Sequence, residues 1–284
     1  MRPALARAIW HHLEAINAVA YFSPESREAA DRVGLKGFWM GYFASRAAPL
    51  GPVGPSVVEA LFFNFSPTMV RRSIPAAWSL AEPSAIIESR GLAASEALVR
   101  TVPGIEGIAS RVVPMLETCV RNAPGSGRPL FSSNRDVVTS EDPVGSLWQL
   151  ATTLREHRGD AHVCVLCSEG LSGCEPHQLI AAESDMPAEV LRDNRGWSEG
   201  EWRSAARLLT ERGLLDGRGK LTFAGREVRE EIELATDELA AMAYAAIGDT
   251  GVEELIEHLY EPARVISGSG IVPYPNPVSL PPLP

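Results

Sequence analysis

The sequence of 284 residues contains little cysteine and no long apolar run. Its four cysteines are too few for the disulfide framework of a secreted protein, so we expect a protein of the reducing cytoplasm. No stretch approaches the roughly eighteen uninterrupted apolar residues of a membrane-spanning helix. The N-terminus carries no hydrophobic segment followed by a cleavage site. We therefore expect no membrane partner.

Positive charge is scarce as well. The formal net charge of −10 argues against a protein that wraps nucleic acid with its whole surface. The glycine-rich patterns of nucleotide-binding loops, the serine elbow of hydrolases and the HExxH pattern of zinc peptidases are all missing from the sequence. A hydrophobic content of 45% with 22% charged residues is typical of a globular chain, and the length suffices for two domains.

Helical signals dominate the first half of the chain. Apolar residues recur at steps of three and four from residue 4 to residue 20 and predict an amphipathic helix. Ser23-Pro24 and Ser66-Pro67 combine a capping residue with a first-turn proline, so each predicts a helix start. A stretch rich in Gly, Pro and Ser over residues 121–143 predicts a domain boundary. We expect a helical domain at 1–142 and a second domain at 143–284.

The second half carries a different pattern, a short helix followed by a turn and a longer helix. Ser198 and Glu201 form a capping box at the start of the longer helix, and Gly213 ends it. Two glycines in the run 216–220 predict a tight turn, after which residues 221–223 return as a strand. The expected fold is mainly α, an N-terminal helical bundle plus a C-terminal winged helix-turn-helix with a small β-hairpin wing. Dimerisation helices and an extended, proline-rich tail complete the second domain.

Two resemblances fit this architecture. The runs Arg-Gly-Leu-Leu-Asp at 212–216 and Leu-Thr-Phe-Ala-Gly at 221–225 resemble the winged helix of MarR-type regulators. Over nearly its full length the chain is similar to an actinobacterial group of helix-turn-helix proteins, sometimes called SalK-like, through the runs 21–25, 37–43, 46–52, 154–162 and 195–198. The resemblance implies the architecture and no particular activity, because one fold hosts many functions.

The charges of the predicted reading helix disfavour DNA. Its first turn carries Glu199 and Glu201, where a phosphate chain would approach. Residues 195–230 hold eight basic and six acidic residues, a small positive excess. If DNA were nevertheless bound, the contacts would come from the helix and the wing, that is from Trp202, Arg203, Arg207, Arg218 and Lys220.

The densest polar cluster of the sequence spans residues 155–162. His157, His162, Glu156 and Arg158 could act as acid, base and anion clamp, and are the candidate catalytic residues. A structural role is the alternative, in which Arg158 stabilises one helix end and Asp160 caps the next helix.

An aromatic stretch with embedded polar groups predicts a ligand pocket. The candidate ligand-binding residues are His11, Tyr21, Trp39, Tyr42, Arg46 and Asn64. Core packing explains most of the aromatic residues equally well. The favoured function is a small-molecule-binding protein or a biosynthetic enzyme that keeps a winged-helix scaffold. It would bind a small organic ligand and form a homodimer through its C-terminal helices, and a ligand-responsive, MarR-like transcriptional regulator is the alternative.

A haem or metal binder is a third possibility. His11, His12 and His162 would supply its ligands, with Glu14 on the same helix face as His11. The CxxC spacing of Cys164 and Cys167 lies in an apolar segment, so we expect both cysteines in the core. The sequence identifies no cofactor.

Overall fold

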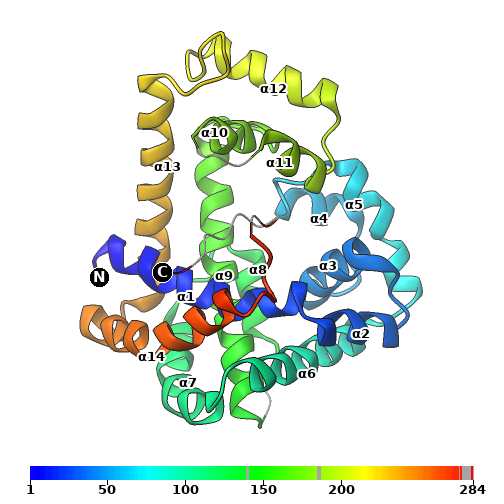
Figure 1. The fold of residues 1–284 in the computed structure, drawn as a ribbon, viewed down its shortest axis with the longest axis vertical. Helices are drawn as coiled ribbons and strands as arrows, with labels where there is room; N and C mark the ends of the chain where they lie inside the picture. Colours follow the sequence, from blue (N-terminus) through cyan, green and yellow to red (C-terminus); the bar gives the residue numbers. More distant parts are fainter. Residues whose placement is uncertain (139–140, 184–186, 275, 277–282, 284) are drawn as a thin grey trace.

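The computed structural model describes residues 1–138, 141–183, 187–274, 276 and 283, and in that part the chain is almost entirely helical (Figure 1). The first seven α-helices are α1 (Pro3–Phe22), α2 (Pro24–Arg32), α3 (Gly37–Ala47), α4 (Pro55–Leu61), α5 (Pro67–Ser73), α6 (Pro83–Thr101) and α7 (Ile105–Asn122). The other seven are α8 (Pro129–Arg135), α9 (Pro143–Ser168), α10 (Glu175–Glu183), α11 (Ala188–Asn194), α12 (Glu199–Glu211), α13 (Phe223–Ala241) and α14 (Gly248–Gly268). Short 3₁₀ helices lie at η1 (Ala48–Leu50), η2 (Ala76–Ser79) and η3 (Met242–Tyr244). The prediction of a mainly α protein is confirmed.

Local signals start many of these helices. Proline stands in the first turn of α1, α2, α4, α5, α6, α8 and α9, where its missing N–H costs no hydrogen bond. The predicted capping box is present, since Ser198 Oγ accepts from Glu201 N at 3.2 Å and Glu201 Oε2 accepts from Ser198 N at 2.8 Å. Ser23 also caps α2 as predicted, whereas the side chain of Ser66 makes no capping bond to α5.

The long helix α9 runs through the centre of the molecule (Figure 1). It contacts α1, α6, α7, α8 and α13, and most of its residues are buried. The predicted break at Gly159 is wrong, because α9 continues from Pro143 to Ser168. Asp160 therefore caps no following helix; its carboxylate instead accepts from Phe131 N in the first turn of α8 at 2.9 Å. From Val144 to Ala161 every residue of α9 is buried or half-buried, so this part of the helix carries its polar side chains into the interior.

Three apolar cores surround this helix. The largest joins α1, α6, α7, α9 and α14, so it extends across the predicted boundary at residues 142–143. A second core fills the space around α3, α4 and α5, and a third lies among the end of α9, α10, α12 and α13. Division into two folding units stays a prediction.

The predicted β-hairpin wing is wrong. Among the described residues no strand forms, and the segment between α12 and α13 holds a single antiparallel bridge, Leu215 to Leu221. Asp216 Oδ1 accepts from both Arg218 N and Lys220 N, at 2.8 and 2.9 Å, and curls the segment into a compact turn. This turn fills residues 216–220, and the pairing on either side of it does not extend beyond Leu215 and Leu221.

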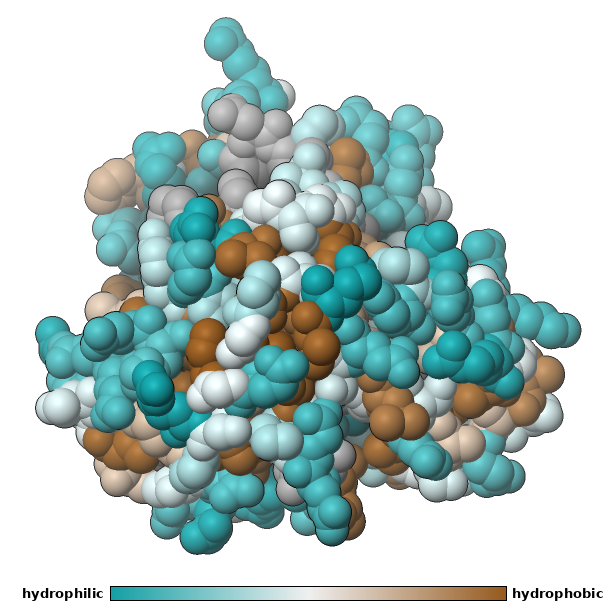
Figure 2. All heavy atoms as spheres, turned by 60° about the horizontal axis from the view of Figure 1, so that its bottom comes forward, coloured by the Kyte–Doolittle hydropathy of each residue, from teal (hydrophilic) through white to brown (hydrophobic). Residues whose placement is uncertain are grey.

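The proline-rich tail lies largely outside the described residues. Before it, Val272 is buried in the largest core, and the Tyr274 hydroxyl is 3.0 Å from Ser267 Oγ. No described helix is long and apolar enough to cross a bilayer. On the face shown in Figure 2, hydrophobic side chains form small groups between hydrophilic ones. Such a mixture is ordinary on the surface of a globular protein.

Candidate functional site

A cavity of about 320 Å³ lies beside the second core, whose Tyr42, Phe62 and Phe65 form part of its lining. Its walls come from α1, α3, the segment between α4 and α5, α8, α9, α10, the end of α11 and α13. Helices from both halves of the chain thus border one space. Its charged and imidazole-bearing lining residues are Glu14, Arg46, Arg155, Glu156, Arg158, His162, His177, Arg195, Arg229 and Glu233.

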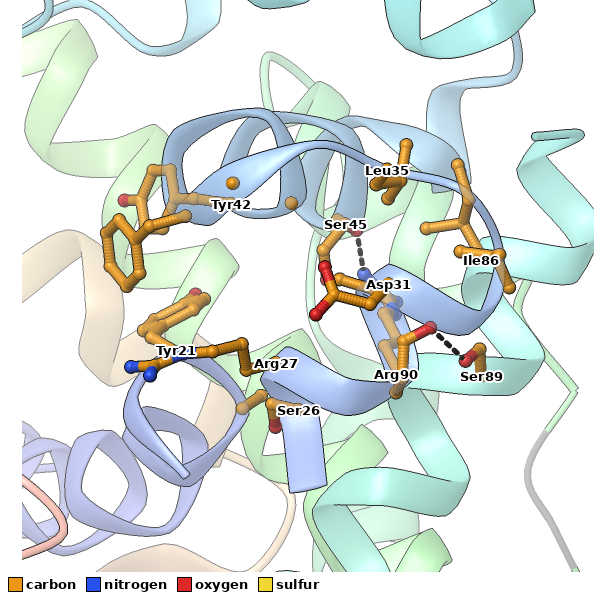
Figure 3. Close-up of a pocket in the computed structure, with 17 residues that line it drawn as sticks. Tyr21, Ser26, Arg27, Asp31, Leu35, Tyr42, Ser45, Ile86, Ser89 and Arg90 are labelled. Carbon is orange, nitrogen blue, oxygen red and sulfur yellow. Dashed lines mark hydrogen bonds between the residues drawn. The ribbon is translucent and has the colours of Figure 1, made fainter. Parts of the chain in front are cut away.

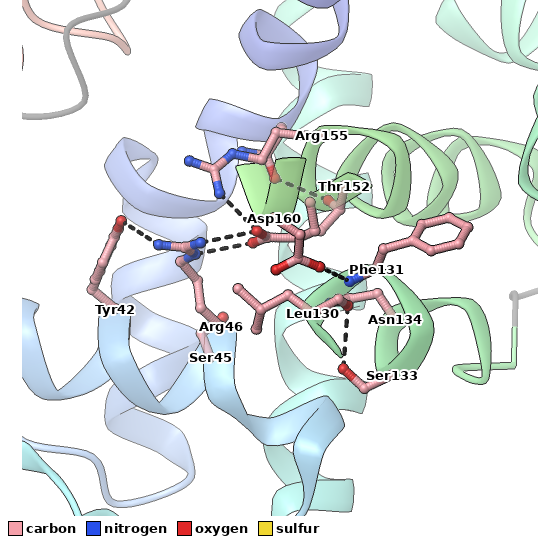
Figure 4. Close-up of polar contacts among 12 residues, drawn as sticks. Tyr42, Ser45, Arg46, Leu130, Phe131, Ser133, Asn134, Thr152, Arg155 and Asp160 are labelled. Carbon is pink, nitrogen blue, oxygen red and sulfur yellow. Dashed lines mark hydrogen bonds and ion pairs between the residues drawn. The ribbon is translucent and has the colours of Figure 1, made fainter. Parts of the chain in front are cut away.

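A chain of ion pairs crosses one wall of the cavity (Figure 4). Arg46 donates to both carboxylate oxygens of Glu156, at 3.0 and 2.9 Å, and to the Tyr42 hydroxyl at 3.0 Å. Arg155 donates to Glu156 at 2.9 Å and to Glu14 at 3.0 Å. Because Glu156 is 1% exposed, this chain joins α3, α9 and α1 inside the protein.

A second cluster of ion pairs joins α13 to α9 and α10. Arg158 Nη1 donates to Asp237 at 2.5 Å and its Nη2 donates to Glu233 at 3.1 Å. Arg229 pairs with Glu183 at 2.6 Å. Asp237 and Glu183 do not line the cavity themselves. They hold the guanidiniums of Arg158 and Arg229 in fixed positions at its border.

Aromatic rings form another part of the lining. Phe62, Phe63 and Phe65 line the cavity between α4 and α5. The Arg46 guanidinium lies 4.3 Å from the Phe62 ring centre, and the Arg195 guanidinium lies 4.3 Å from that of Phe65. Guanidiniums stacked on rings are weakly hydrated and held in place, which prepares them to receive a planar anion.

Two hydrogen bonds fasten this aromatic segment to the helix-turn-helix region. Ser66 N donates to the carbonyl of Arg195 at 2.9 Å, and Trp197 Nε1 donates to the carbonyl of Asn64 at 3.1 Å. Gly173, just before α10, lies so close that an added Cβ would stand 2.1 Å from the Phe63 carbonyl oxygen. This close backbone contact requires glycine at position 173.

The protonation states of the site follow from burial and from the arginines. Burial raises the pKa of Glu156, but Arg155 and Arg46 outweigh it and bring the pKa down to about 2. Burial likewise raises the pKa of Tyr42, and Arg46, Arg195 and Arg155 together lower it below its usual 10. Burial lowers the pKa of His162 to about 4, so this imidazole is neutral near pH 7.

The lining of the cavity holds more arginines than carboxylates, and Asp237 and Glu183 pair with Arg158 and Arg229 from outside the lining. Five arginines and three glutamates line the cavity, while both of its imidazoles are neutral. A partly apolar cavity lined by several arginines favours a small organic anion.

Three of the four candidate catalytic residues line this cavity, namely Glu156, Arg158 and His162. His157 faces away from it and packs edge-on against Phe131, with ring centres 4.9 Å apart. Burial lowers the pKa of His157 to about 3, and among the described residues its Nε2 has no hydrogen-bond partner. This histidine therefore has the surroundings of a packed core residue.

The candidate ligand-binding residues are divided among several places. Tyr42, Arg46 and Asn64 line the cavity. Trp39 packs in the second core, and His11 lines a separate groove between α1 and α13. Tyr21 lines a smaller pocket of about 60 Å³ bounded by α2, α3 and α6, which it shares with Tyr42 (Figure 3). The prediction therefore assigned to one ligand pocket residues that the fold places in different parts of the protein.

The outward cations of α12 are paired within the helix. Arg203 lies 3.2 Å from Glu199, and Arg207 lies 2.9 Å from Glu211. Trp202 is half-buried, and its carbonyl accepts from Gln178 Nε2 at 2.7 Å. Arg218 and Lys220 are exposed on the compact turn that replaces the expected wing.

No group of three or more potential metal-ligating side chains occurs in the described part of the chain. His12 Nδ1 lies 2.8 Å from the Ala8 carbonyl, and His162 Nδ1 lies 3.0 Å from Thr236 Oγ1. The expectation of buried CxxC cysteines is wrong, because Cys164 and Cys167 are both exposed on α9. Their apolar neighbours face inward and leave the two thiols on the outer side of the helix near its end.

The candidate set omitted several residues of the cavity: Glu14, Arg155, His177, Arg195, Arg229 and Glu233. The burial of Arg155 could have been predicted, because its helix has no continuous polar face. An arginine in such a helix must find a partner inside the protein. The burial of Arg195 and Arg229 could not be predicted in this way, because charged neighbours surround each of them in the sequence.

Comparison with known proteins gives one result, at the level of family. No curated protein and no solved structure matches the chain at a significant level. A family model described as a helix-turn-helix family matches residues 6–273, which include every helix that borders the cavity. The match extends far beyond α11 and α12, so the cavity and the helix-turn-helix region lie within one family unit. The chain therefore belongs to this helix-turn-helix family.

Proposed function

We propose that the protein binds a small organic acid in the arginine-lined cavity. One observation carries this proposal: five guanidiniums, placed by four separate helical regions, border a single half-open cavity. Burying an arginine is costly unless its charge is compensated. Carboxylates of the protein already pair with Arg46, Arg155, Arg158 and Arg229, and an acidic ligand would add bidentate hydrogen bonds along this row of guanidiniums, which guanidinium geometry favours.

The rest of the lining fits the body of such a ligand. Phe62, Phe63, Phe65, Leu61 and Ile180 supply apolar surface beside the charged wall. Small-molecule sites combine this kind of apolar surface with a few polar groups that fix orientation. A cavity of about 320 Å³ has room for a ligand with one or two rings.

Thermal unfolding with matched ligands tests the proposal. Aromatic carboxylates such as 2-naphthoate should raise the melting temperature, whereas the neutral 2-naphthamide should not, because only the acid carries a carboxylate that the guanidiniums can bind. The variant Arg195→Met should lose this response, and Arg203→Met, on the exposed face of α12, should keep it. Equal shifts with acid and amide would contradict the proposal.

The same cavity would be the active site of a biosynthetic enzyme. In that case Glu156 would position Arg46 and Arg155, because two guanidiniums already occupy its carboxylate and hold its pKa at about 2. His162, which borders the cavity as a neutral imidazole, would be the group able to accept a proton.

A ligand-responsive DNA-binding regulator is the second candidate, favoured by the family match. Against it, the exposed arginines of α12 are neutralised by Glu199 and Glu211. A gel shift with the upstream region of the protein's own gene, run at low and at moderate salt, distinguishes the two functions. A sequence-selective, salt-sensitive complex would favour the regulator.

We further propose a homodimer that forms through the C-terminal helices. Leu234, Met242 and Tyr260 expose between 43% and 48% of their surface on α13, η3 and α14. Light scattering after size exclusion measures the mass directly. Leu234→Lys should shift a dimer to the monomer, and a monomeric wild-type protein would overturn the proposal.

A further inference from the structure

Two polar side chains of the cavity have hydrogen-bonding atoms that the protein leaves unused. His177 is 2% exposed, and neither its Nδ1 nor its Nε2 makes a hydrogen bond to the described residues. The Asn64 main-chain carbonyl lies close enough to this imidazole to raise its pKa slightly against the effect of burial, but the two groups make no well-formed hydrogen bond, and the carbonyl also accepts from Trp197. The side-chain oxygen Oδ1 of Asn64 is buried and has no partner either. Both residues line the arginine cavity.

Unused buried polar atoms are unusual in a folded protein, where nearly all find a partner. An imidazole without a well-formed hydrogen bond is costly, and two such groups that line the same cavity point to a partner within that cavity. The other unpartnered histidine nitrogens of the chain, on His11, His12 and His157, belong to residues outside the lining. His177 and Asn64 are therefore the pair whose missing partners a bound molecule could supply.

The charge state of His177 determines what this partner is. Burial, and then the nearby charge of Arg195, lower the pKa of His177 to about 3. Near pH 7 the ring is neutral, with one N–H donor and one acceptor nitrogen. A neutral imidazole has no charge with which to hold a carboxylate, and the arginines already hold one. Its natural partner is a group that both donates and accepts.

We propose that His177 and Asn64 recognise a neutral hydroxyl group on the bound acid, so that the ligand class is hydroxylated organic acids. This inference rests on the proposed acid-binding function. The acid group lies at the arginines, the ring or chain lies along the phenylalanines, and the hydroxyl lies between His177 and the side-chain oxygen of Asn64. The hydroxyl donates to one acceptor and accepts from the imidazole N–H.

Matched pairs of acids test this assignment by calorimetric titration. The pairs are phenylacetate with 4-hydroxyphenylacetate, 3-phenylpropionate with 3-(4-hydroxyphenyl)propionate, and 2-naphthoate with 6-hydroxy-2-naphthoate. In at least one pair the hydroxylated acid should bind the wild-type protein at least about tenfold more tightly, because a site built to bond a hydroxyl rejects the analogue without it.

Variants locate the effect. His177→Leu should bind both members of the pair equally, with the affinity of the plain acid, whereas His12→Leu, the same change at a buried histidine outside the cavity, should keep the preference. Retained binding of the plain acid shows that the His177→Leu cavity is intact. If His177→Leu does not fold, Asn64→Leu replaces it in the same titration. This variant should show a reduced preference for the hydroxylated acid.

The possible outcomes distinguish the hydroxyl assignment from the acid-binding function on which it rests. If the wild-type protein binds both members of every pair equally, or if His177→Leu keeps the preference, the hydroxyl assignment is wrong and acid binding stands. In that case water satisfies the two side chains. If no acid in any pair binds, the acid-binding function fails and the hydroxyl assignment fails with it.

Discussion

Substitution of Glu156 by glutamine gives the sharpest test of the ion-pair chain in the cavity. The Glu156 carboxylate accepts two hydrogen bonds from Arg46 and one from Arg155, and the side chain is 1% exposed. Glutamine keeps the shape of the side chain and removes its charge. Two buried guanidiniums then face a neutral amide, one of whose groups is itself a donor. We expect a large loss of stability, because a buried charge without its counter-charge is expensive.

The pKa of Glu156 sets the size of this loss. Burial raises this pKa, but Arg155 and Arg46 lower it from 4.5 to about 2. A shift of this size corresponds to about 3 kcal/mol of folding free energy at neutral pH, since one pKa unit is worth about 1.4 kcal/mol. Because the folded pKa is depressed, this stabilisation is fully present above about pH 4.5. It is lost as the pH falls from about 4.5 to about 2.

Urea unfolding of the wild-type protein and of Glu156→Gln measures the effect. The difference in unfolding free energy should be about 3 kcal/mol near pH 7 and should shrink steadily on acidification. Glu211→Gln is the matched control, because its partner Arg207 lies on the exposed face of α12 and surface pairs contribute little. A difference below about 1 kcal/mol near pH 7 would refute the reasoning, as would one that stays constant with pH.

Three further predictions concern residues around the cavity. Burial raises the pKa of Asp160 to about 7, so the wild-type protein should lose folding stability as the pH rises from about 4 to about 7. Asp160→Asn does not ionise, and its urea midpoint should therefore rise relative to that of the wild-type protein over this pH range. Equal midpoints of the two proteins at every pH would contradict this prediction. Gly173→Ala should lower stability by about 1–3 kcal/mol in thermal unfolding, because its Cβ would clash with the Phe63 carbonyl. A thiol reagent should label Cys164 and Cys167 quickly in the native protein, and labelling of all four cysteines at one rate would show that the buried pair is accessible.

The sequence predicts helix starts well, because the signals that start a helix are local. Ser198 and Glu201 are three residues apart and satisfy each other's backbone partners wherever the helix lies in the fold. A proline in the first turn acts in the same local way. Such starts are readable from a few neighbouring residues, and the structure places α2, α5 and α12 where these signals predict them.

The expected helix break at Gly159 shows where local reading fails. A glycine inside a helix costs only about 1 kcal/mol relative to alanine. The residues on both sides of Gly159 are buried against α1, α8 and α13, and that packing outweighs the local cost. The Asp160 carboxylate consequently accepts a hydrogen bond from the first turn of α8 rather than from its own neighbours in the chain. The wing failed for a different reason, since the Asp216 side chain takes up the two amides that a hairpin would have used.

The cavity could be predicted only in part. Glu156, Arg158 and His162 stood out because they are close in sequence, and Arg46 stood out among aromatic residues, but Arg195 and Arg229 lie on two other helical regions that only the complete packing brings to the cavity. An isolated arginine in a charged neighbourhood reads as a surface residue. Its burial depends on how helices cross, and that is a property of the whole chain.

The arginines around α11 and α12 support our proposal that a small acid in the cavity, rather than a phosphate chain, is the partner of this region. Arg195, directly after α11, is 8% exposed and borders the cavity, and its carbonyl is tied to Ser66 of the N-terminal half. The arginines that face outward from α12 are paired with carboxylates one turn away. A polyanion approaching from outside meets a nearly neutral helix, whereas a small acid inside the cavity meets guanidiniums already stacked on aromatic rings and fixed in position. Electrostatic attraction acts most strongly where water is excluded, so the buried arginines define the stronger anion site.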